Sequence, residues 1–213
     1  MDNNLSQIVQ TLSLTMGVAW ASGINLYAAV LMLGLLGATG HMTLPENLQI
    51  LANPLIILAA GVMYLVEFFA DKTPGVDSGW DALHTFIRIP AGAVLAAGAV
   101  GAMNPAVAIA AGIVGGGLTA SVHATKAGSR VLINNSPEPF SNWVTSVAED
   151  VIVLGGLFAA LYHPWLFLGL LVLFILLMIW LLPKLWRGLR RLFGYLGRLC
   201  GRRGVPLSDK EGG

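Results

Sequence analysis

Long apolar runs follow one another along this chain, and short polar connections separate them. The run from Trp165 to Leu182 carries no charged side chain, and a helix needs about twenty such residues to cross a bilayer. The sequence therefore predicts an all-α, polytopic integral membrane protein with about six transmembrane helices. We expect these helices at residues 11–38, 49–69, 80–103, 105–123, 143–162 and 165–182.

The composition points to the same environment. Apolar residues make up 56% of the 213 residues and charged residues 11%, whereas a soluble domain carries about 25% charged residues to keep its surface wetted. No Lys or Arg precedes the first apolar run, so we expect this run to be retained as a helix and not removed as a signal peptide. These observations exclude a water-soluble globule.

Basic residues are distributed unevenly over the connections. Lys72, Lys126 and Arg130 lie in the second and fourth connections, and Arg88 lies just inside the third helix. The first, third and fifth connections contain no Lys or Arg, and the other eight basic residues follow the sixth helix. The positive-inside rule assigns the basic side to the cytoplasm. An even number of spans then predicts that both termini are cytoplasmic.

The segment after Pro183 has a separate pattern, in which apolar residues recur at three-to-four spacing and arginines occupy the opposite face. We expect a transmembrane domain at 1–183 and a basic, amphipathic cytoplasmic tail at 184–213. Such a helix lies on the inner leaflet and binds anionic lipid, at about 1 kcal/mol per basic residue. Its role stays open between a topology anchor and a regulatory site for lipid or a partner. The expected lipid-facing arginines are Arg187, Arg190, Arg191, Arg198 and Arg202.

Two connections resemble each other and predict a weak internal repeat. The sequence P-G-V-D-S-G-W ends at Trp80 and P-E-P-F-S-N-W ends at Trp143, with Pro, Ser and Trp at the same spacing. The repeat unit would pair the second helix with the third and the fourth with the fifth, as parallel repeats with a site between them. The serines are expected to be N-caps and the tryptophans to lie at the membrane interface. The expected loop residues are Pro74, Ser78, Trp80, Pro137, Ser141 and Trp143.

Charged and polar side chains gather beside these two connections. Asp77, Asp81, His84 and Arg88 follow one another at spacings of four, three and four, so they share one helical face. An ionised side chain at bilayer depth costs at least about 2.5–3.5 kcal/mol unless it is paired or wetted, and we expect Arg88 to pair with a carboxylate of the fifth helix. The expected partners are Glu149 and Asp150.

This constellation has two interpretations. It predicts either a water-filled cytoplasmic vestibule with an ion pair at its floor, or a buried ion pair that only pins two helices together. The residues expected along a substrate or ion pathway are Asn25, Glu67, Asp71, Lys72, Asp77, Asp81, His84, Arg88, His123, Lys126, Arg130, Glu149 and Asp150.

The first helix contains small residues and a carboxamide near its middle, in the stretch Ala21 to Asn25. Such residues weaken a helix, and a broken helix is tolerated in a membrane where its backbone lines a cavity or packs on protein. Small residues also allow neighbouring helices to approach closely. Both explanations are open from the sequence.

Motifs for catalysis or for bound cofactors are absent. The four histidines have neither H-x-x-x-H nor H-E-x-x-H spacing, and Cys200 is the only cysteine, so we expect no metal site. The sequence contains no G-x-S-x-G motif, phosphate-binding loop or dinucleotide fingerprint. We therefore expect no cofactor and no nucleic-acid partner, and a function other than catalysis is favoured.

Three motifs resemble a known family. They are S-G-I-N-L-Y at 22–27, F-A-D-K-x-P-x-x-D-x-x-W-D at 69–81 and H-A-T-K-A-x-S-R at 123–130. They resemble a family of small multi-pass bacterial membrane proteins, the domain of unknown function 4126, over roughly the first five helices. The resemblance implies a bacterial inner (cytoplasmic) membrane location and little mechanism. It directs attention to Asn25, Asp71, Lys72, Pro74, Asp77, Trp80, Asp81, Lys126 and Arg130.

The leading functional hypothesis is a small transporter or channel for an ion or small polar solute, working as a homo-oligomer. Its charged cytoplasmic vestibule would lie between the two repeats. A second hypothesis is a membrane enzyme that acts on a lipid head group, with His84 and Asp81 as an acid–base pair. A third is a non-catalytic scaffold that binds a partner or lipid through the arginine tail.

Overall fold

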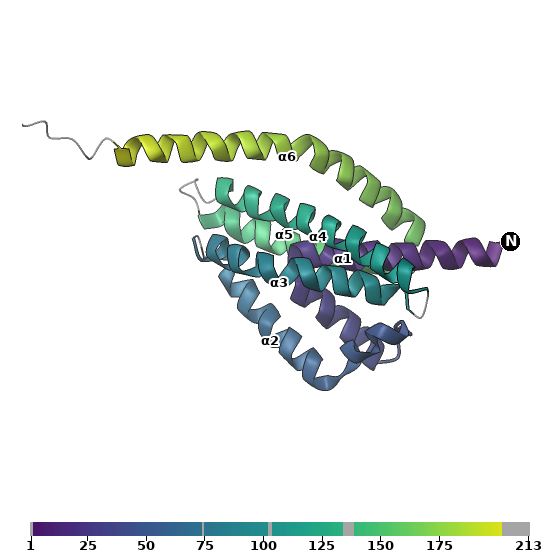
Figure 1. The fold of residues 1–213 in the computed structure, drawn as a ribbon. Coiled ribbons are helices and arrows are strands. Elements are labelled where there is room, and N and C mark those ends of the chain that lie inside the picture. The colour runs from purple at the N-terminus through teal and green to yellow at the C-terminus, as the bar shows by residue number, and fades with distance from the viewer. Residues whose placement is uncertain (1, 74, 102–103, 134–138, 202–213) are drawn as a thin grey trace, which may run out of the picture.

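The structure is a computed structural model, and it describes residues 2–73, 75–101, 104–133 and 139–201 (Figure 1). Within these ranges the side chains of 2–3, 132, 139–142, 189 and 191–201 are not described. Every regular element of the described residues is a helix, which confirms the all-α prediction. The elements are α1 (Asp2–Ala38), the 3₁₀ helix η1 (Glu46–Ala52), α2 (Pro54–Ala70), α3 (Val76–Ala99), α4 (Pro105–Ile133), α5 (Pro139–Tyr162) and α6 (Pro164–Gly201).

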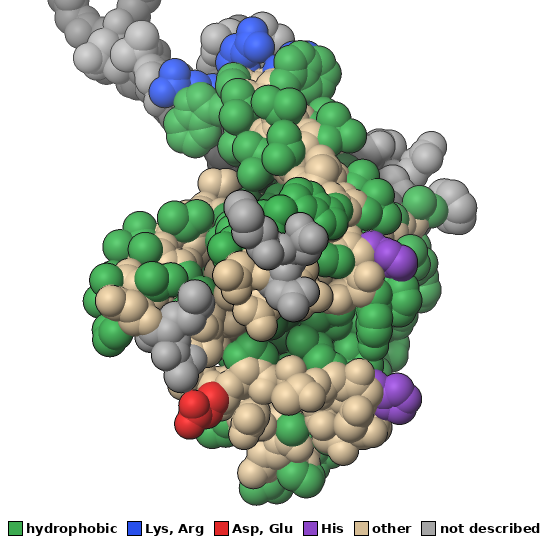
Figure 2. Space-filling view, turned by 90° about the vertical axis from the view of Figure 1, so that its right-hand side faces the viewer, with side chains coloured by type: hydrophobic (Ala, Val, Ile, Leu, Met, Phe, Trp, Pro, Cys, Tyr) green, Lys and Arg blue, Asp and Glu red, His purple; other side chains and the backbone are tan. Residues whose placement is uncertain are grey.

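The helices have the length and the outer surface of a membrane protein. Five of them (α1, α3, α4, α5 and α6) are long and apolar enough to cross a bilayer, and η1 with α2 forms a sixth candidate that is bent by 69°. Large apolar side chains point outward, such as Phe86, which is 83% exposed, and Leu55, which is 74% exposed. Hydrophobic side chains cover much of the face shown in Figure 2. The chain is a polytopic membrane protein, as the apolar pattern predicts.

Helix α1 is not straight, because it breaks at Asn25. The backbone there is extended (φ −146°, ψ 97°), and helical geometry resumes after it. The half before the break runs beside α4, where the Thr119 hydroxyl donates to the Ala19 carbonyl over 2.7 Å. The half after the break lies along α2, with Leu31 against Gly61. The predicted weak point of this helix is therefore a real break.

The second half of α1 turns back toward the end of the bundle from which the first half came. It finishes against η1, where Gly37 packs on Ala52. The Asn47 side chain of η1 in turn donates to the Gly101 carbonyl just after α3. The start of α1 borders the same region, since it lines a hollow together with Val100. Both ends of α1 thus lie where α3 ends and α4 begins, and only the break reaches the middle (Figure 1).

The course of α1 separates the two termini. The later part of α6 lies at the opposite end of the bundle, where Leu182 and Leu185 line a hollow with Ser78 of α3 and Val131 of α4. The N-terminal end of α1 and the C-terminal part of α6 therefore point in opposite directions (Figure 1). In the described residues the first and last helices therefore end on opposite sides of the bundle, because α1 bends back, and the cytoplasmic location of both termini stays a prediction.

Helix α3 does not begin at Ser78, the residue predicted to be its N-cap. Helix α3 begins at Val76, and its N-cap is Gly75, whose φ of 85° is in the left-handed region that favours glycine. The Asp77 carboxylate accepts the backbone N–H groups of Gly75 and Ser78, so an aspartate takes the capping role expected of the serine. Ser141 likewise lies inside α5, which begins at Pro139. Pro74 and Pro137 lie outside the described residues.

Helix α6 continues through Pro183 to Gly201, so the predicted boundary at 183 is not a break in the helix. The Lys184 ammonium lies 3.0 Å from the centre of the Trp180 ring, and the Arg190 guanidinium lies 5.1 Å from the Trp186 ring. Arg187 is exposed as well. The side chains of Arg191 and Arg198 are not described, and Arg202 lies outside the described residues. The division into two domains and the internal repeat stay predictions.

Glycines allow α3 and α4 to pack closely behind the break in α1. A Cβ atom at Gly92 of α3 would collide with the Thr119 side chain of α4, and one at Gly115 would collide with Ala96. Gly23 of α1 has the same kind of close neighbour in Val122. The small residues therefore bring three helices together around the point where α1 breaks.

Candidate functional site

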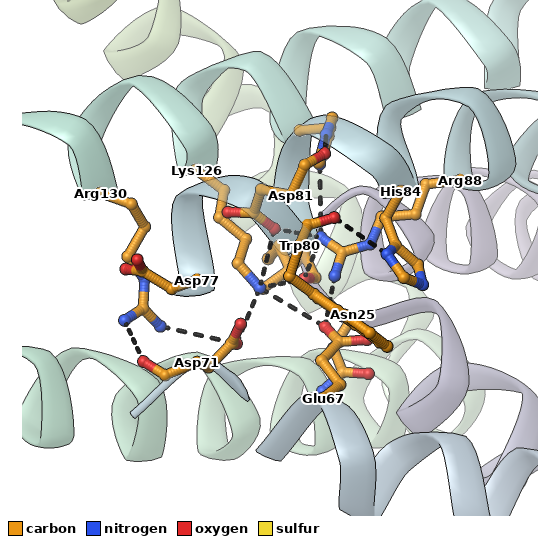
Figure 3. Close-up of polar contacts among 12 residues, drawn as sticks. Asn25, Glu67, Asp71, Asp77, Trp80, Asp81, His84, Arg88, Lys126 and Arg130 are labelled. Atoms are coloured by element: carbon orange, nitrogen blue, oxygen red, sulfur yellow. Dashed lines mark hydrogen bonds and ion pairs between the residues drawn. The ribbon is translucent and has the colours of Figure 1, made fainter. Parts of the chain in front are cut away.

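Charged side chains, nearly all of them buried, meet at the break in α1, and we call them the charge cluster (Figure 3). The helices α2, α3, α4 and α5 and the α2–α3 connection all contribute to it. The Glu67, Arg88 and Arg130 side chains are 0% exposed, and Glu149, the most exposed member, is 15% exposed. The members are Glu67, Asp71, Asp81, Arg88, Lys126, Arg130 and Glu149.

Lys126 of α4 is the centre of the charge cluster. Its ammonium lies 3.0 Å from Asp71 Oδ2, 3.4 Å from Glu149 Oε2, 3.5 Å from Glu67 Oε1 and 3.8 Å from Asp81 Oδ1. One ammonium therefore faces carboxylates from α2, α3, α5 and the α2–α3 connection. Each helix that contributes a carboxylate is tied to α4 through this single charge.

The two arginines complete the ion pairs on either side of Lys126. The Arg88 guanidinium pairs with Glu67 and lies 3.2 Å from Asp81 Oδ1. The Arg130 guanidinium binds both oxygens of Glu149, at 2.7 and 3.2 Å, and it donates to the Asp71 carbonyl over 3.0 Å. Two-point pairing of this kind fixes orientation as well as distance.

The predicted partner of Arg88 is wrong. The sequence favours Glu149 or Asp150, but Arg88 pairs with Glu67 and Asp81. Glu149 is held by Arg130 of the neighbouring α4, and Asp150 accepts the Asn25 amide over 3.1 Å. The sequence gives the depth of each charge along its helix, whereas the packing angle of α2 decides which carboxylate faces Arg88.

The break in α1 is bound directly by the charge cluster. The Ile24 carbonyl, at the end of the first half of α1, accepts the Arg88 guanidinium over 3.1 Å and the Lys126 ammonium over 2.9 Å. The Asn25 carboxamide caps the second half, because its Oδ1 accepts the backbone N–H of Ala28 over 2.9 Å. Its Nδ2 donates to Asp150. A single asparagine thus starts the new helix and anchors it to α5.

The charges match the helix dipoles at this break. The end of a helix carries a partial negative charge and the start a partial positive charge. Arg88 and Lys126 lie at the end of the first half, and Asp150 approaches the start of the second half through Asn25. The electrostatics of the site therefore stabilise the break.

His84 and His123 lie beside the charge cluster. His84 Nδ1 lies 2.9 Å from the Trp80 carbonyl, which can only accept, so the proton is on Nδ1 and Nε2 faces the Tyr27 hydroxyl at 3.0 Å. His123 Nδ1 lies 3.3 Å from Arg88, which can only donate, so its proton is on Nε2. His84 forms no hydrogen bond with the Asp81 side chain, so the acid–base pair of the enzyme hypothesis is not formed in this geometry.

Lys72 lies beside the charge cluster, in the connection between α2 and α3. Its ammonium donates to the Phe68 carbonyl over 3.0 Å and to the Ser146 hydroxyl over 3.3 Å. Burial lowers the pKa of Lys72 from its usual range, and the nearby carboxylates of Asp150 and Asp71 oppose this effect. Lys72 therefore ties the connection to α5 near the end of the bundle.

The residues predicted for the pathway come together, but the predicted open vestibule is not found in this conformation. Hydrogen bonds and ion pairs join Asn25, the charge cluster, His123 and Asp150, with His84 and Lys72 at the edge and Asp77 at the start of α3. Three hollows of about 900, 410 and 370 Å³ lie elsewhere, and none of the three is lined by a member of the charge cluster. The charge cluster is closed.

Two groups in the site escaped the sequence reasoning. The Ile24 carbonyl is a main-chain group, so no residue type signals its role. Tyr27, in the second half of α1, forms a hydrogen bond with His84 of α3. The sequence contained a signal for this residue, because Tyr27 follows Asn25 by two residues in the S-G-I-N-L-Y motif. Among the described residues, no group of three or more His, Cys, Asp or Glu is placed to hold a metal ion.

Fold and site together define a class: a polytopic helical membrane protein with a buried charge cluster that closes on a broken helix. The chain belongs to the family described as Domain of unknown function (DUF4126), which matches residues 12–184. The match reaches through the apolar part of α6, further than the five helices that carry the resemblance in the sequence. The chain has no match among curated proteins and none among solved structures.

Proposed function

We propose that the protein is a small transporter for an ion or a small polar solute, and that the charge cluster is its gate, closed in this conformation. The observation that carries the proposal is the Ile24 carbonyl, which the helix break frees from helical hydrogen bonding and which Arg88 and Lys126 bind instead. The proposed location is the bacterial inner membrane, with the end of the bundle that carries Lys72 and the α6 tail in the cytoplasm.

Helix breaks of this kind are common in transporters. Discontinuous helices present free carbonyls and N–H groups near the middle of the membrane, where charged side chains, ions or substrates can bind them. Ionisable residues at that depth are rare, because even a paired charge is costly there, and they mark ion and substrate paths. Both features meet at Asn25 and Ile24.

A purely structural role explains less of the site. Buried ion pairs contribute little net stability, and apolar side chains of similar volume often hold helices together equally well. An unbroken α1 would also satisfy its own backbone groups without help from Arg88 or Lys126. The lipid-enzyme alternative has no support from the geometry, because His84 and Asp81 do not form their expected pair.

The proposal is tested by flux into liposomes that contain the purified protein. The panel comprises sodium, potassium, chloride and one acidic, one basic and one neutral amino acid, each labelled. We expect wild type to carry at least one of them and Arg88→Ala to lose most of that flux. Arg88→Lys should have an intermediate flux, because it keeps the positive charge but loses the two-point hydrogen bonding of the guanidinium group. Folded wild-type protein that carries none of the panel would contradict the proposal.

A further inference from the structure

The charge cluster is not electrically balanced. Four carboxylates (Glu67, Asp71, Asp81 and Glu149) face three cations (Arg88, Lys126 and Arg130), which leaves one surplus negative charge. Neither His84 nor His123 forms an ion pair with these carboxylates in the described structure: His84 contacts the Trp80 carbonyl and the Tyr27 hydroxyl, and His123 Nδ1 faces the Arg88 guanidinium. The nearby Lys72 and Asp150 are of opposite sign and cancel.

Oxygen atoms without partners lie on the same carboxylates. Glu67 Oε2, Asp71 Oδ1 and Asp81 Oδ2 are buried and have no hydrogen-bond partner among the described residues. A buried anionic oxygen without a donor is costly, and a buried surplus charge away from water is more so. One added positive charge removes the surplus, and the smallest is a proton, which also converts one of these oxygens into a neutral hydroxyl.

Glu67 is the best position for this proton. Its side chain is fully buried in α2, one turn before Asp71 and the connection. Arg88 of α3 and Lys126 of α4 both approach Oε1, which leaves Oε2 free. Asp81 of α3 also faces this region, and Tyr27 of α1 lies within electrostatic range of Glu67.

Glu149 and Asp71 are less completely buried than Glu67. Glu149 of α5 accepts hydrogen bonds from two of the three Arg130 side-chain nitrogens and is partly exposed. Asp71 shares Lys126 and Arg130 next to the connection, where some exposure remains. Burial disfavours the charged form most strongly where it is complete, and of these groups only Glu67 is 0% exposed.

We infer that the charge cluster holds one exchangeable proton on the Glu67 carboxyl group, and that transport exchanges this proton for a monovalent cation. This inference rests on the proposed transport function. When the proton leaves Glu67 for water, the carboxylate restores the surplus negative charge, and one monovalent cation restores the balance. A divalent cation or an anion would leave the charge cluster unbalanced, so neither fits the exchange.

Infrared spectroscopy of the purified protein tests the proton without any flux. We expect a protonated-carboxyl band at neutral pH that is lost in Glu67→Gln, is retained in Glu149→Gln, and fades in wild type as rising pH removes the proton. Gln is a close mimic of protonated Glu, so Glu67→Gln should unfold at nearly the wild-type temperature. Glu149→Gln removes the negative charge that pairs with Arg130, so this variant should unfold at a lower temperature. A missing band, or a band that Asp81→Asn removes and Glu67→Gln does not, overturns the assignment.

Proton movement in liposomes tests the exchange. A pH-sensitive dye is enclosed, and sodium, potassium or methylammonium chloride is added outside. We expect at least one cation to drive protons out through wild type, at least tenfold faster than through Glu67→Gln, with the exposed Glu46→Gln as a matched control at the wild-type rate. No proton movement, while another solute of the panel is carried, overturns the inference and leaves the transporter proposal standing. Absence of all flux overturns both.

Discussion

Two groups of cations lie toward the same end of this molecule, and their surroundings differ in almost every respect. The charge cluster holds Arg88, Lys126 and Arg130 in contact with four carboxylates and nearly out of reach of solvent. The described cations of the α6 tail are exposed, and two of them, Lys184 and Arg190, lie over the rings of Trp180 and Trp186. A count of Lys and Arg by loop treats both groups alike, as markers of the cytoplasmic side.

The difference lies in what each group would lose with its charge. A tail cation is solvated and interacts with aromatic rings and lipid head groups, so its removal leaves no buried charge without a partner. A cation of the charge cluster neutralises buried carboxylates, so its removal leaves them unpaired. The comparison therefore predicts large effects inside the bundle and small effects on the tail, for the same type of substitution.

The largest effect is expected for Arg88→Ala. It leaves Glu67 and Asp81 without their guanidinium and frees the Ile24 carbonyl, so the free energy of unfolding should fall by about 3–5 kcal/mol. Thermal or denaturant unfolding in detergent measures this change. The matched control is Arg187→Ala in the tail, which should change the free energy by less than about 0.5 kcal/mol. Equal effects at the two positions would contradict the comparison.

A smaller loss of stability is expected for Gly92→Ala, one turn beyond Arg88 on α3. The added methyl group collides with Thr119 and forces α3 and α4 apart, and overpacking of this kind costs about 1–3 kcal/mol. Gly117→Ala is the control, because nothing lies within 4 Å of the added atom. Unfolding of both variants is compared in one detergent, and a stable Gly92→Ala would show that the packing behind the charge cluster can relax.

Asn25→Ala tests whether the cap at the break in α1 affects transport as well as stability. It removes the cap of Ala28 and the bond to Asp150, and should lower the free energy of unfolding by about 1 kcal/mol and reduce flux severalfold. Asn53→Ala removes a similar cap at the start of α2, where Asn53 Oδ1 accepts the Leu55 N–H. It should cost similar stability and leave flux unchanged, and a loss of flux in both variants would argue against a special role for Asn25.

The smallest effect on the folded protein is expected in the tail. Replacing Arg187 and Arg190 together by alanine should weaken binding to vesicles with anionic lipid by about 1 kcal/mol per residue, and leave stability and flux at wild-type values. Binding is measured for the purified protein in detergent-free nanodiscs of graded anionic lipid content. Loss of flux in this variant would favour the tail as the functional region.

Sequence reasoning succeeds here wherever a single helix determines the answer. The apolar runs predict the helices, and the spacing of Asp77, Asp81, His84 and Arg88 predicts one shared face, which the structure shows to be buried. Predictions from the sequence fail where contacts with a neighbouring helix determine the structure. The break at Asn25 is stabilised by Arg88 and Lys126 from two other helices, and no local pattern shows that α1 turns back.

The same limit explains the errors at the site. A charge at a given depth can meet any helix at that depth, so Arg88 could be matched with Glu149 as readily as with Glu67 until the position of α2 was known. The closed state of the charge cluster also follows from packing, since it needs four helices to meet within a few ångströms of Lys126. Types of residue can be predicted from the sequence, whereas partners require the fold.

The central claim is that the charge cluster opens to water during transport, and one measurement tests it most directly. In a Cys200→Ser background, Ser22→Cys places a thiol two residues before Ile24, at a site that is 0% exposed. Ser13→Cys is the matched control on the same helix, also 0% exposed, and it lies beside Ala160, away from the charge cluster. The account predicts that a charged, membrane-impermeant thiol reagent modifies Ser22→Cys in membrane vesicles and leaves Ser13→Cys unmodified. Folded Ser22→Cys protein that stays unmodified from both sides would contradict it.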